Sequence, residues 1–231
     1  MQGPNHQIRF NVHRNGSAAE EVFNFKAAVI AGWTGRDATA LEKHIHELEA
    51  LGVARPASTP IFYRVSAALL TTAPVIEVPS DHSSGEVEFA LLNSGGRLYV
   101  GVGSDHTDRK VETYGVTVSK QMCAKPLAPV LWDMADVASH WDELVLRAWA
   151  VDGDRRELYQ EGKVTAMLAP TELLNKYSSE GLGEGTAMFC GTLAVHGGIR
   201  PANRFEFELE DPVLRRSIKH GYDVLSLPVL G

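Results

Sequence analysis

The 231-residue sequence predicts an α+β fold dominated by mixed β-sheet. Two observations support this prediction. Short segments that alternate apolar and polar residues, or that are rich in β-branched and aromatic residues, recur along most of the chain and are separated by Gly, Pro, Asn and Asp. Only a few stretches place apolar residues at helical spacing. No repeat and no linker-like Gly/Ser run divides the sequence, which indicates a single domain over residues 1–231.

The N-terminal residues predict a β-hairpin. Residues 7–14 alternate apolar and polar side chains, and Asn15-Gly16 supplies the positive-φ pair that a tight hairpin turn favours. Residues 22–32 (VFNFKAAVIAG) resume with β-branched and aromatic residues. We therefore expect an N-terminal hairpin unit at residues 1–25, followed by the core of the domain at residues 26–231.

An amphipathic helix is predicted between Asp37 and Leu51. Four apolar residues recur there at helical spacing, namely Leu41, Ile45, Leu48 and Leu51. Asp37 can cap the first turn, and Gly52 stands where a helix would end.

The rest of the chain is predicted to be mostly strand. The expected elements are strands at residues 61–70, 75–78, 85–92, 97–103, 186–193 and 205–214, and a hairpin through Asp152-Gly153 within residues 145–158. Helical spacing returns at residues 132–146, and Pro170 introduces a short helix at residues 170–177. The β-branched run at residues 116–119 (VTVS) predicts one further strand, which ends at Lys120.

The composition limits the classes of partner. The chain carries 22 Lys and Arg against 29 Asp and Glu, a formal net charge of −7, which argues against a nucleic-acid phosphate backbone as partner. Cys123 and Cys190 match neither a disulfide framework nor a CxxC pattern, so we expect buried thiols in a reducing compartment. Residues 1–9 are polar and no apolar run approaches about 18 residues, so we expect a cytoplasmic protein without a membrane partner.

Two glutamates alternate with apolar residues in one predicted strand. The period of two places Glu86 and Glu88 on the same face, where they form half of an oxygen site for Mg²⁺, Mn²⁺ or Ca²⁺. Asp105 is the candidate for the third carboxylate, because it follows the predicted strand at residues 97–103 and a Gly-Ser pair that allows close backbone approach. Asp108 is the alternative third ligand. If the strand lies at a sheet edge, the two glutamates merely face solvent.

Two His-x-x-Glu pairs lie on the predicted N-terminal helix. His44 and Glu47 are three residues apart, as are His46 and Glu49, so in either pair the carboxylate can orient the imidazole as a general base. The helical pattern does not decide which pair faces a site. The alternative is that both pairs belong to the solvated face of a charged helix.

Three further polar residues could bind a small ligand. Lys120 could bind a carboxylate or stabilise an oxyanion. Gln160 and Thr192 offer uncharged hydrogen-bonding groups of the kind that orient a ligand. An exposed lysine and ordinary turn chemistry explain the same residues equally well.

Taken in order, these segments resemble the fumarylacetoacetate hydrolase-like family, and most closely a bacterial branch of it without an assigned reaction. The resemblance covers roughly residues 26–212 and rests on the order of the motifs rather than on any one of them. The matching segments are KHIHEL, PIFYRVS, GEVEF, SDHTDR, SKQMCAKPLAP, QEGKVTAM and FCGTL. The residues that depart from the family pattern include Arg64, His106, Ala128 and Leu193.

The resemblance implies a β-rich mixed-sheet roll or barrel of the fumarylacetoacetate hydrolase C-terminal type, with peripheral helices and usually assembled as a homodimer. It implies that residues 26–231 form a catalytic core with one divalent cation, Mg²⁺ or Mn²⁺ with Ca²⁺ as an alternative. It assigns roles that we list by function: the metal ligands Glu86, Glu88 and Asp105, the catalytic residues His44, Glu47 and Lys120, and the substrate-binding residues Arg64, Arg109, Gln160 and Thr192.

The activity that follows is metal-dependent C–C hydrolysis of a small 2-oxo acid of acylpyruvate type, through a metal-stabilised enolate. A decarboxylase or a sugar-acid dehydratase could use the same site, because these reactions share the enolate. A protein of another class, which binds a carboxylic acid without turnover, is suggested by the departures at Arg64 and His106. A third alternative is a structural β-domain whose motifs are coincidental.

Overall fold

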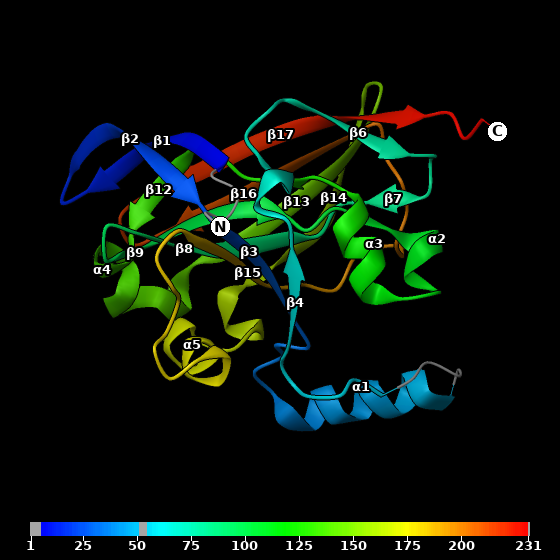
Figure 1. Cartoon of the computed structure of the whole chain (residues 1–231), viewed down its shortest axis with the longest axis horizontal. Helices are drawn as coiled ribbons and strands as arrows, with labels where there is room; N and C mark the ends of the chain where they lie inside the picture. The colour runs from blue at the N-terminus through cyan, green and yellow to red at the C-terminus, as the bar shows by residue number, and fades with distance from the viewer. Residues whose placement is uncertain (1–5, 51–54, 231) are drawn as a thin grey trace, which may run out of the picture.

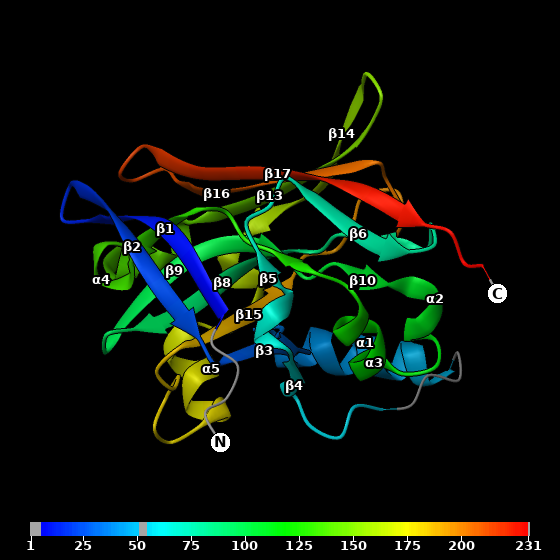
Figure 2. The same cartoon turned by 45° about the horizontal axis from the view of Figure 1, so that its top comes forward.

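The computed structural model describes residues 6–50 and 55–230, and within helix α1 (Ala38–Ala50) the side chains at positions 44, 47, 48 and 50 lie outside the description. Two β-sheets, packed as layers, form the framework of the described residues (Figures 1 and 2). In spatial order the larger sheet contains β2 (Ser17–Phe25), β1 (His6–Arg14), β12 (Val130–Asp133), β9 (Arg97–Ser104), β8 (Val87–Ser94), β15 (Thr186–Thr192), β3 (Ala27–Gly32) and β4 (Ile61–Val65). The smaller sheet contains β14 (Arg155–Lys163), β13 (Val145–Asp152), β16 (Arg204–Asp211), β17 (Arg216–Leu227) and β6 (Val75–Pro79).

Short elements connect and flank the two sheets. The two-stranded pairs are β10 (Thr107–Asp108) with β7 (Ser83–Ser84) and β11 (Lys125–Pro126) with β5 (Leu70–Thr71). The helices besides α1 are α2 (Arg109–Glu112), α3 (Val116–Met122), α4 (Met134–Val137) and α5 (Pro170–Tyr177), with single 3₁₀ segments at Ala67–Leu69, Ala138–Glu143 and Val164–Ala166. Both parallel and antiparallel pairings occur, as in β1 with β12 and β8 with β9. The predicted β-dominated α+β fold of mixed sheet is confirmed.

Both predicted hairpins form. β1 and β2 pair from His6 opposite Phe25 to Arg14 opposite Ser17, around Asn15 and Gly16, which both have positive φ. The second hairpin joins β13 and β14 one residue later than predicted: Asp152 pairs with Arg155, so the turn is Gly153-Asp154, with Gly153 at φ +59°. Positive φ at these turns matches the twist of the flanking strands.

Helix α1 also matches its prediction closely. Asp37 Oδ1 accepts hydrogen bonds from the backbone N–H groups of Thr39 and Ala40, at 2.9 and 3.0 Å, and thereby caps the first turn. Ile45 is buried, as its spacing predicted. The expected end of the helix at Leu51 and Gly52 lies outside the described residues.

The central strand β8 is buried on both faces, and this determines where the core lies. Val87, Phe89 and Leu91 join the apolar cluster between the two sheets. Ala90 and Leu92 point to the opposite face and join a second cluster with residues of β1 and β2. Glu88 lies on the same face of β8 as Ala90 and Leu92, so a charged side chain lies among the apolar residues of the first six positions of the strand.

The predicted strand at residues 61–70 is interrupted: β4 ends at Val65, a 3₁₀ segment covers Ala67–Leu69, and β5 begins at Leu70. Two other predicted elements are wrong, and tertiary contacts explain both. Residues 132–146 do not form one helix: Trp132 and Asp133 complete β12 between β1 and β9, two short helical segments follow, and β13 begins at Val145. Residues 116–119 form the start of helix α3 rather than a strand, with Ser119 Oγ donating to the Val116 carbonyl oxygen at 2.8 Å. In both segments the surrounding fold overrides local propensity.

Two further predictions concern burial and the membrane. Cys123 and Cys190 are buried free thiols, as expected from their spacing. None of the helices in residues 6–50 and 55–230 has the length and apolar character needed to cross a membrane.

Candidate metal centre

Three acidic side chains converge where β8 begins and β9 ends. Glu86 immediately precedes β8, Glu88 lies within it, and Asp105 follows β9. The two strands pair antiparallel with Val87 opposite Ser104, which brings these ends together. One carboxylate oxygen of each acid lies within 4.8 Å of the other two. The structure therefore brings together the three acids that the sequence analysis selected, which we call the acidic triad.

Asp108, the alternative third ligand, has a different position. Its Oδ1 accepts a 2.9 Å hydrogen bond from the Val111 N–H and caps α2. The group of described acids close enough to hold one ion contains Asp105 and not Asp108.

Glu88 is the triad member with the least compensated charge. Its side chain lies inside the sheet, where the residue is 2% exposed, and its Oε2 accepts a 2.7 Å hydrogen bond from the Gly191 N–H. Burial raises the pKa of Glu88 well above its ordinary value, and the negative charges of Asp105 and Glu86 raise it further. A proton or a cation is therefore strongly favoured at this carboxylate.

Asp105 is fully buried between two lysines. Lys120 Nζ donates a hydrogen bond to Asp105 Oδ2, and Lys125 Nζ lies 2.8 Å from Oδ1. Burial alone would raise the pKa of Asp105, but the two ammonium groups outweigh it and lower that pKa to about 2. Sequence reasoning missed Lys125, because a lysine before a proline in a predicted loop carries no local sign of burial.

Glu86 lies at the more open side of the triad and meets two cations. Arg109 Nη2 is 3.1 Å from Glu86 Oε1, and Lys120 Nζ is 3.5 Å from Oε2. Arg109 is held in place by two further hydrogen bonds, from Nε to Ser84 Oγ at 2.7 Å and from Nη1 to Glu112 Oε2 at 3.0 Å. The guanidinium that the resemblance assigned to substrate thus touches the triad directly.

Gln160 and Thr192 clamp the backbone between the two glutamates. Gln160 Oε1 accepts the Val87 N–H at 2.9 Å, and Thr192 Oγ1 donates to the Val87 carbonyl oxygen at 2.8 Å. The Gln160 amide nitrogen donates to Thr192 Oγ1 and to the Leu193 carbonyl oxygen, at 2.8 and 2.6 Å. These bonds use both donors of a fully buried amide, so the two residues position the glutamates.

A buried chain of hydroxyl and imidazole groups supports the triad from the smaller sheet. His106 Nε2 lies 2.8 Å from Ser83 Oγ, and its Nδ1 lies 2.9 Å from Tyr222 Oη. The Tyr222 hydroxyl also meets Ser104 Oγ at 2.8 Å, and Ser104 Oγ accepts the Glu86 N–H at 3.1 Å. Burial lowers the pKa of His106 to about 3, and the charges of Lys125 and Arg109 act in the same direction. The His106 ring is therefore neutral.

The residues present fit a hard divalent cation. Three carboxylates with oxygens within 4.8 Å match the oxygen-rich donor sets of Mg²⁺, Mn²⁺ and Ca²⁺, whose opposite ligands lie about 4–5 Å apart. Asp105 Oδ1 is buried and, among the described residues, accepts no well-directed hydrogen bond despite its ion pair with Lys125. Asp105 Oδ1 can therefore still coordinate a cation. Glu86, Glu88 and Asp105 are the residues that would hold the ion.

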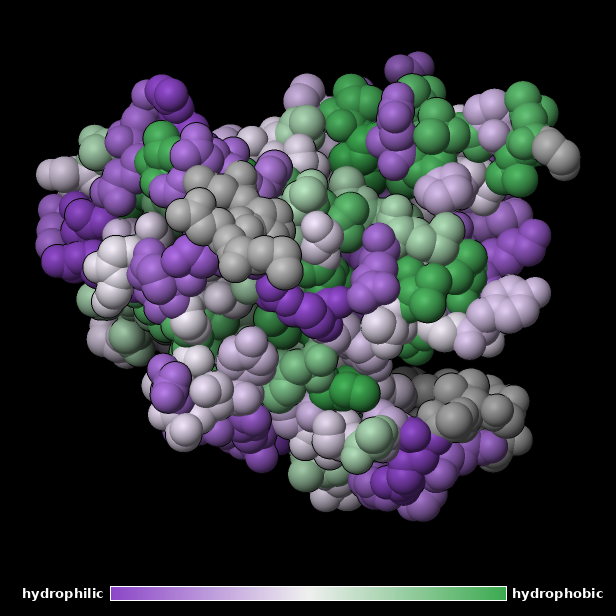
Figure 3. Space-filling model, in the orientation of Figure 1, coloured by the Kyte–Doolittle hydropathy of each residue, from purple (hydrophilic) through white to green (hydrophobic). Residues whose placement is uncertain are grey.

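Two other predicted site residues lie at the surface. Arg64 is exposed on β4, where its guanidinium donates to the carbonyl oxygens of Lys26 and Ala28 and lines a hollow of about 450 Å³ with Gln121. In the described part of the chain Arg64 makes no ion pair with the triad. Hydrophilic side chains gather over α1 (Figure 3), and the exposed His46 ring is 3.2 Å from both Glu42 and Glu49.

For the pair His44 and Glu47, the structure places the backbone on α1, and the side chains lie outside the description. The assignment of His44 and Glu47 to the site, with His46 and Glu49 as the alternative pair, therefore stays a prediction.

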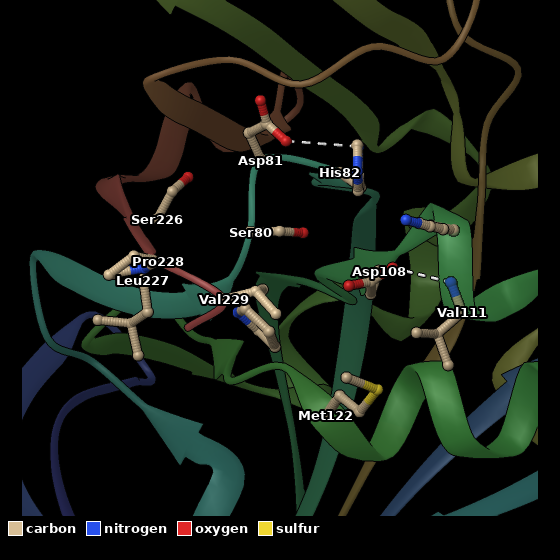
Figure 4. A pocket seen from close by; sticks show the side chains of 12 residues that line it. Ser80, Asp81, His82, Asp108, Val111, Met122, Ser226, Leu227, Pro228 and Val229 are labelled. Atoms are coloured by element: carbon tan, nitrogen blue, oxygen red, sulfur yellow. Dashed lines mark hydrogen bonds and ion pairs between the residues drawn. The ribbon is translucent and has the colours of Figure 1, made fainter. Parts of the chain in front are cut away.

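A separate hollow of about 680 Å³ is lined by residues of the C-terminal segment together with His82 and Asp108 (Figure 4). In Figure 4 Ser226, Leu227 and Val229 of the C-terminal segment face His82 and Asp108 across it. None of the three acids lines this hollow. The hollow is therefore not the candidate catalytic site, because the three triad carboxylates and the cations paired with them do not line it.

Sequence comparison matches the chain to one protein family. A family model described as “Protein of unknown function (DUF2848)” matches residues 31–222. No curated protein has a significantly similar sequence.

Several solved structures share the architecture. A yeast fumarylacetoacetate hydrolase family protein superposes with a TM-score of 0.63 at 17% identity, covering 89% of this chain and 95% of that one. A 5-carboxymethyl-2-hydroxymuconate delta-isomerase from Mycobacterium smegmatis gives 0.63 at 15% identity, over 92% and 84% of the two chains. A 2-keto-3-deoxy-D-arabinonate dehydratase gives 0.60 at 15% identity, over 91% and 77%. The predicted resemblance to the fumarylacetoacetate hydrolase fold is confirmed.

Proposed function

We propose that this chain, which belongs to the protein family described as “Protein of unknown function (DUF2848)”, is a divalent-metal-dependent enzyme that breaks a bond in a small 2-oxo acid. The convergence of Glu86, Glu88 and Asp105 carries this proposal, because two of these carboxylates are buried and all three offer oxygens within 4.8 Å. Crowding buried carboxylates destabilises a fold. A binding role explains why such a group is present.

The chain's own cations suit an anionic substrate. A Mg²⁺ or Mn²⁺ ion held by the triad would supply Lewis acidity to the adjacent oxygens of a 2-oxo acid. Lys120 and Arg109 both reach Glu86, so their positive charges would meet a substrate carboxylate at the more open side of the triad. We propose that Gln160 and Thr192 act mainly by holding Val87 between the two glutamates, and that Arg64 binds substrate at the hollow it lines.

Proton transfer is assigned to α1. His44, oriented by Glu47, would take a proton from the attacking water in a hydrolytic reaction. His46 with Glu49 is the alternative pair, and its ring faces solvent in the present arrangement.

Both the chemistry of the site and the fold bear on the class of reaction that we propose. C–C hydrolysis of an acylpyruvate-type substrate is our first choice, because it uses both the triad and a general base. A protein of the same fold is named as a dehydratase, which favours dehydration of a related acid as the alternative. Decarboxylation is a further alternative, because it would use the same enolate. A homodimer and a cytoplasmic location are further proposals, to be tested by light scattering and cell fractionation.

The test is an assay of the metal-depleted protein with and without added Mg²⁺ or Mn²⁺ on acylpyruvates, oxaloacetate and 2-keto-3-deoxy sugar acids. Turnover that requires the metal and is lost in Glu86→Gln is the expected result. Glu180→Gln makes the same change at an exposed residue outside the triad and should retain full activity. Metal-independent turnover, or equal turnover in both variants, contradicts the proposal.

A non-catalytic acid-binding protein is the second candidate. The buried His106, held by Tyr222 and Ser83 at a position that departs from the family pattern, favours it. Tight, metal-dependent binding of oxalate without turnover of any substrate in the panel would select this candidate.

A further inference from the structure

Lys120 occupies a central place among the triad carboxylates. Its side chain is 9% exposed, and its Nζ donates to Asp105 Oδ2 while lying 3.5 Å from Glu86 Oε2. One ammonium group therefore bridges two of the three acids that would hold a divalent ion.

The other oxygens of these two acids each lie beside a different cation. Glu86 Oε1 pairs with Arg109 at 3.1 Å, and Asp105 Oδ1 pairs with Lys125 at 2.8 Å. A cation bound at Asp105 Oδ1, which accepts no well-directed hydrogen bond, would still share that carboxylate with Lys120. Among the described residues, Lys120 is the cation paired with Glu86 Oε2 and Asp105 Oδ2, the two oxygens that an added cation would bridge. Because like charges repel strongly at such short range in a partly buried site, a divalent ion and this ammonium cannot share those oxygens.

The two lysines differ in their freedom to move. Lys125 is fully buried on β11, and its Nζ also donates a 2.6 Å hydrogen bond to the His106 carbonyl oxygen. Lys120 lies on the two-turn helix α3, whose first turn follows Gly115 without a side-chain cap. The flexible four-carbon stem of a lysine lets its ammonium swing away while the backbone stays in place.

We propose that Lys120 is a built-in counter-ion that takes the place of the divalent cation in the metal-free protein and is displaced when that cation binds. This inference rests on the proposed function, since it concerns the same site. The displaced ammonium then becomes free to bind a substrate carboxylate. Metal and anionic substrate therefore bind in order, the metal first, and metal-free protein is kept from capturing the acid.

The first experiment measures Mn²⁺ affinity by calorimetry, in the absence of any substrate, for the wild type, Lys120→Met and Lys110→Met. Lys110 is an exposed lysine of the neighbouring helix α2, so its variant makes the same change of net charge away from the triad. Removal of the competing ammonium should tighten Mn²⁺ binding by about tenfold or more, whereas Lys110→Met should change it by less than about twofold. Lys120→Gln serves if the Met variant does not fold.

A second measurement follows the lysine itself. Brief acetylation of the wild type, read by mass spectrometry, should label Lys120 faster when Mn²⁺ is bound, while the fully buried Lys125 stays unlabelled in both states.

The outcomes separate this inference from the proposed function. If the wild type binds Mn²⁺ and Lys120→Met binds it equally or more weakly, the inference is wrong and the metal site stands. If only the Lys120 variants bind Mn²⁺, the competition is supported in its strongest form. If none of the proteins binds Mn²⁺, the proposed function fails and this inference fails with it.

Discussion

Gly191 donates its backbone N–H to Glu88 Oε2 at 2.7 Å, in a conformation that only glycine adopts readily. Its φ is +101°, and a Cβ added there would overlap Thr34 Oγ1. The bond lies at the point where the register of β15 against β8 shifts between Phe189 and Thr192. The irregularity thus aims a backbone donor at the most buried glutamate of the triad.

Gly191→Ala should therefore damage both the fold and the site. Steric overlap and an unfavourable φ together should lower the free energy of unfolding by about 3 kcal/mol or more, measured by urea denaturation. Gly198→Ala is the control, because Gly198 also has positive φ, at +87°, but a Cβ there meets nothing within 4 Å. Equal losses of stability in the two variants would show that the close approach to Thr34 is unimportant.

Neutralising two members of the triad should have different effects on stability. Glu88→Gln resembles the protonated form that its raised pKa favours, so stability in the absence of metal should change by no more than about 1 kcal/mol. Asp105→Asn removes the partner of the buried Lys125 and should cost about 3–5 kcal/mol. Both variants should lose Mn²⁺ binding in calorimetry. A larger stability loss for Glu88→Gln than for Asp105→Asn would contradict the assigned charge states.

His106 should make stability fall in mild acid. Its pKa is lowered to about 3 in the folded protein, against 6.5 for an unperturbed imidazole, chiefly through burial. Between these values the unfolded chain binds a proton that the folded protein does not, so the free energy of unfolding falls as the pH drops from about 6.5 toward 3.

Urea unfolding at about pH 7.5 and about pH 5 measures this effect. The difference between the two should shrink by a few kcal/mol at most in His106→Gln. An identical pH dependence in wild type and His106→Gln would rule out His106 as its source.

The Tyr222 hydroxyl should link the smaller sheet to the metal site. Tyr222→Phe removes the group that meets both His106 and Ser104, and Ser104 in turn accepts the Glu86 N–H. We expect a loss of about 1–3 kcal/mol in stability and weaker Mn²⁺ binding. Tyr114→Phe, at a residue that is 87% exposed, should leave both quantities unchanged. Loss of stability with unaltered Mn²⁺ affinity would reduce Tyr222 to a purely structural role.

Local chemistry was sufficient for much of the fold. The hairpins that turn at Asn15-Gly16 and at Gly153 follow from turn residues that accept positive φ, and α1 follows from apolar spacing with a cap at Asp37. The alternation of Glu86 and Glu88 with apolar residues also predicted that both carboxylates share one face, because side chains in a strand repeat every two positions.

Local chemistry failed where distant partners decide the outcome. The β-branched run at residues 116–119 predicted a strand, yet helix α3 forms and carries Lys120 to the triad. The apolar residues at 132–146 have helical spacing, but Trp132 pairs within the larger sheet. A backbone that can hydrogen-bond to a neighbouring strand or pack against another layer follows those long-range contacts over a propensity of a few tenths of a kcal/mol per residue.

The sequence by itself determined most of the strands, the turns and the two glutamates of the triad, because periodicity and turn chemistry are properties of adjacent residues. Only the tertiary structure decided between Asp105 and Asp108 as the third acid, and which charges surround the triad. Lys125 lies 20 residues along the chain from Asp105, and Tyr222 lies 116 residues from His106. Charge compensation and burial depend on distance in space, which no local pattern encodes.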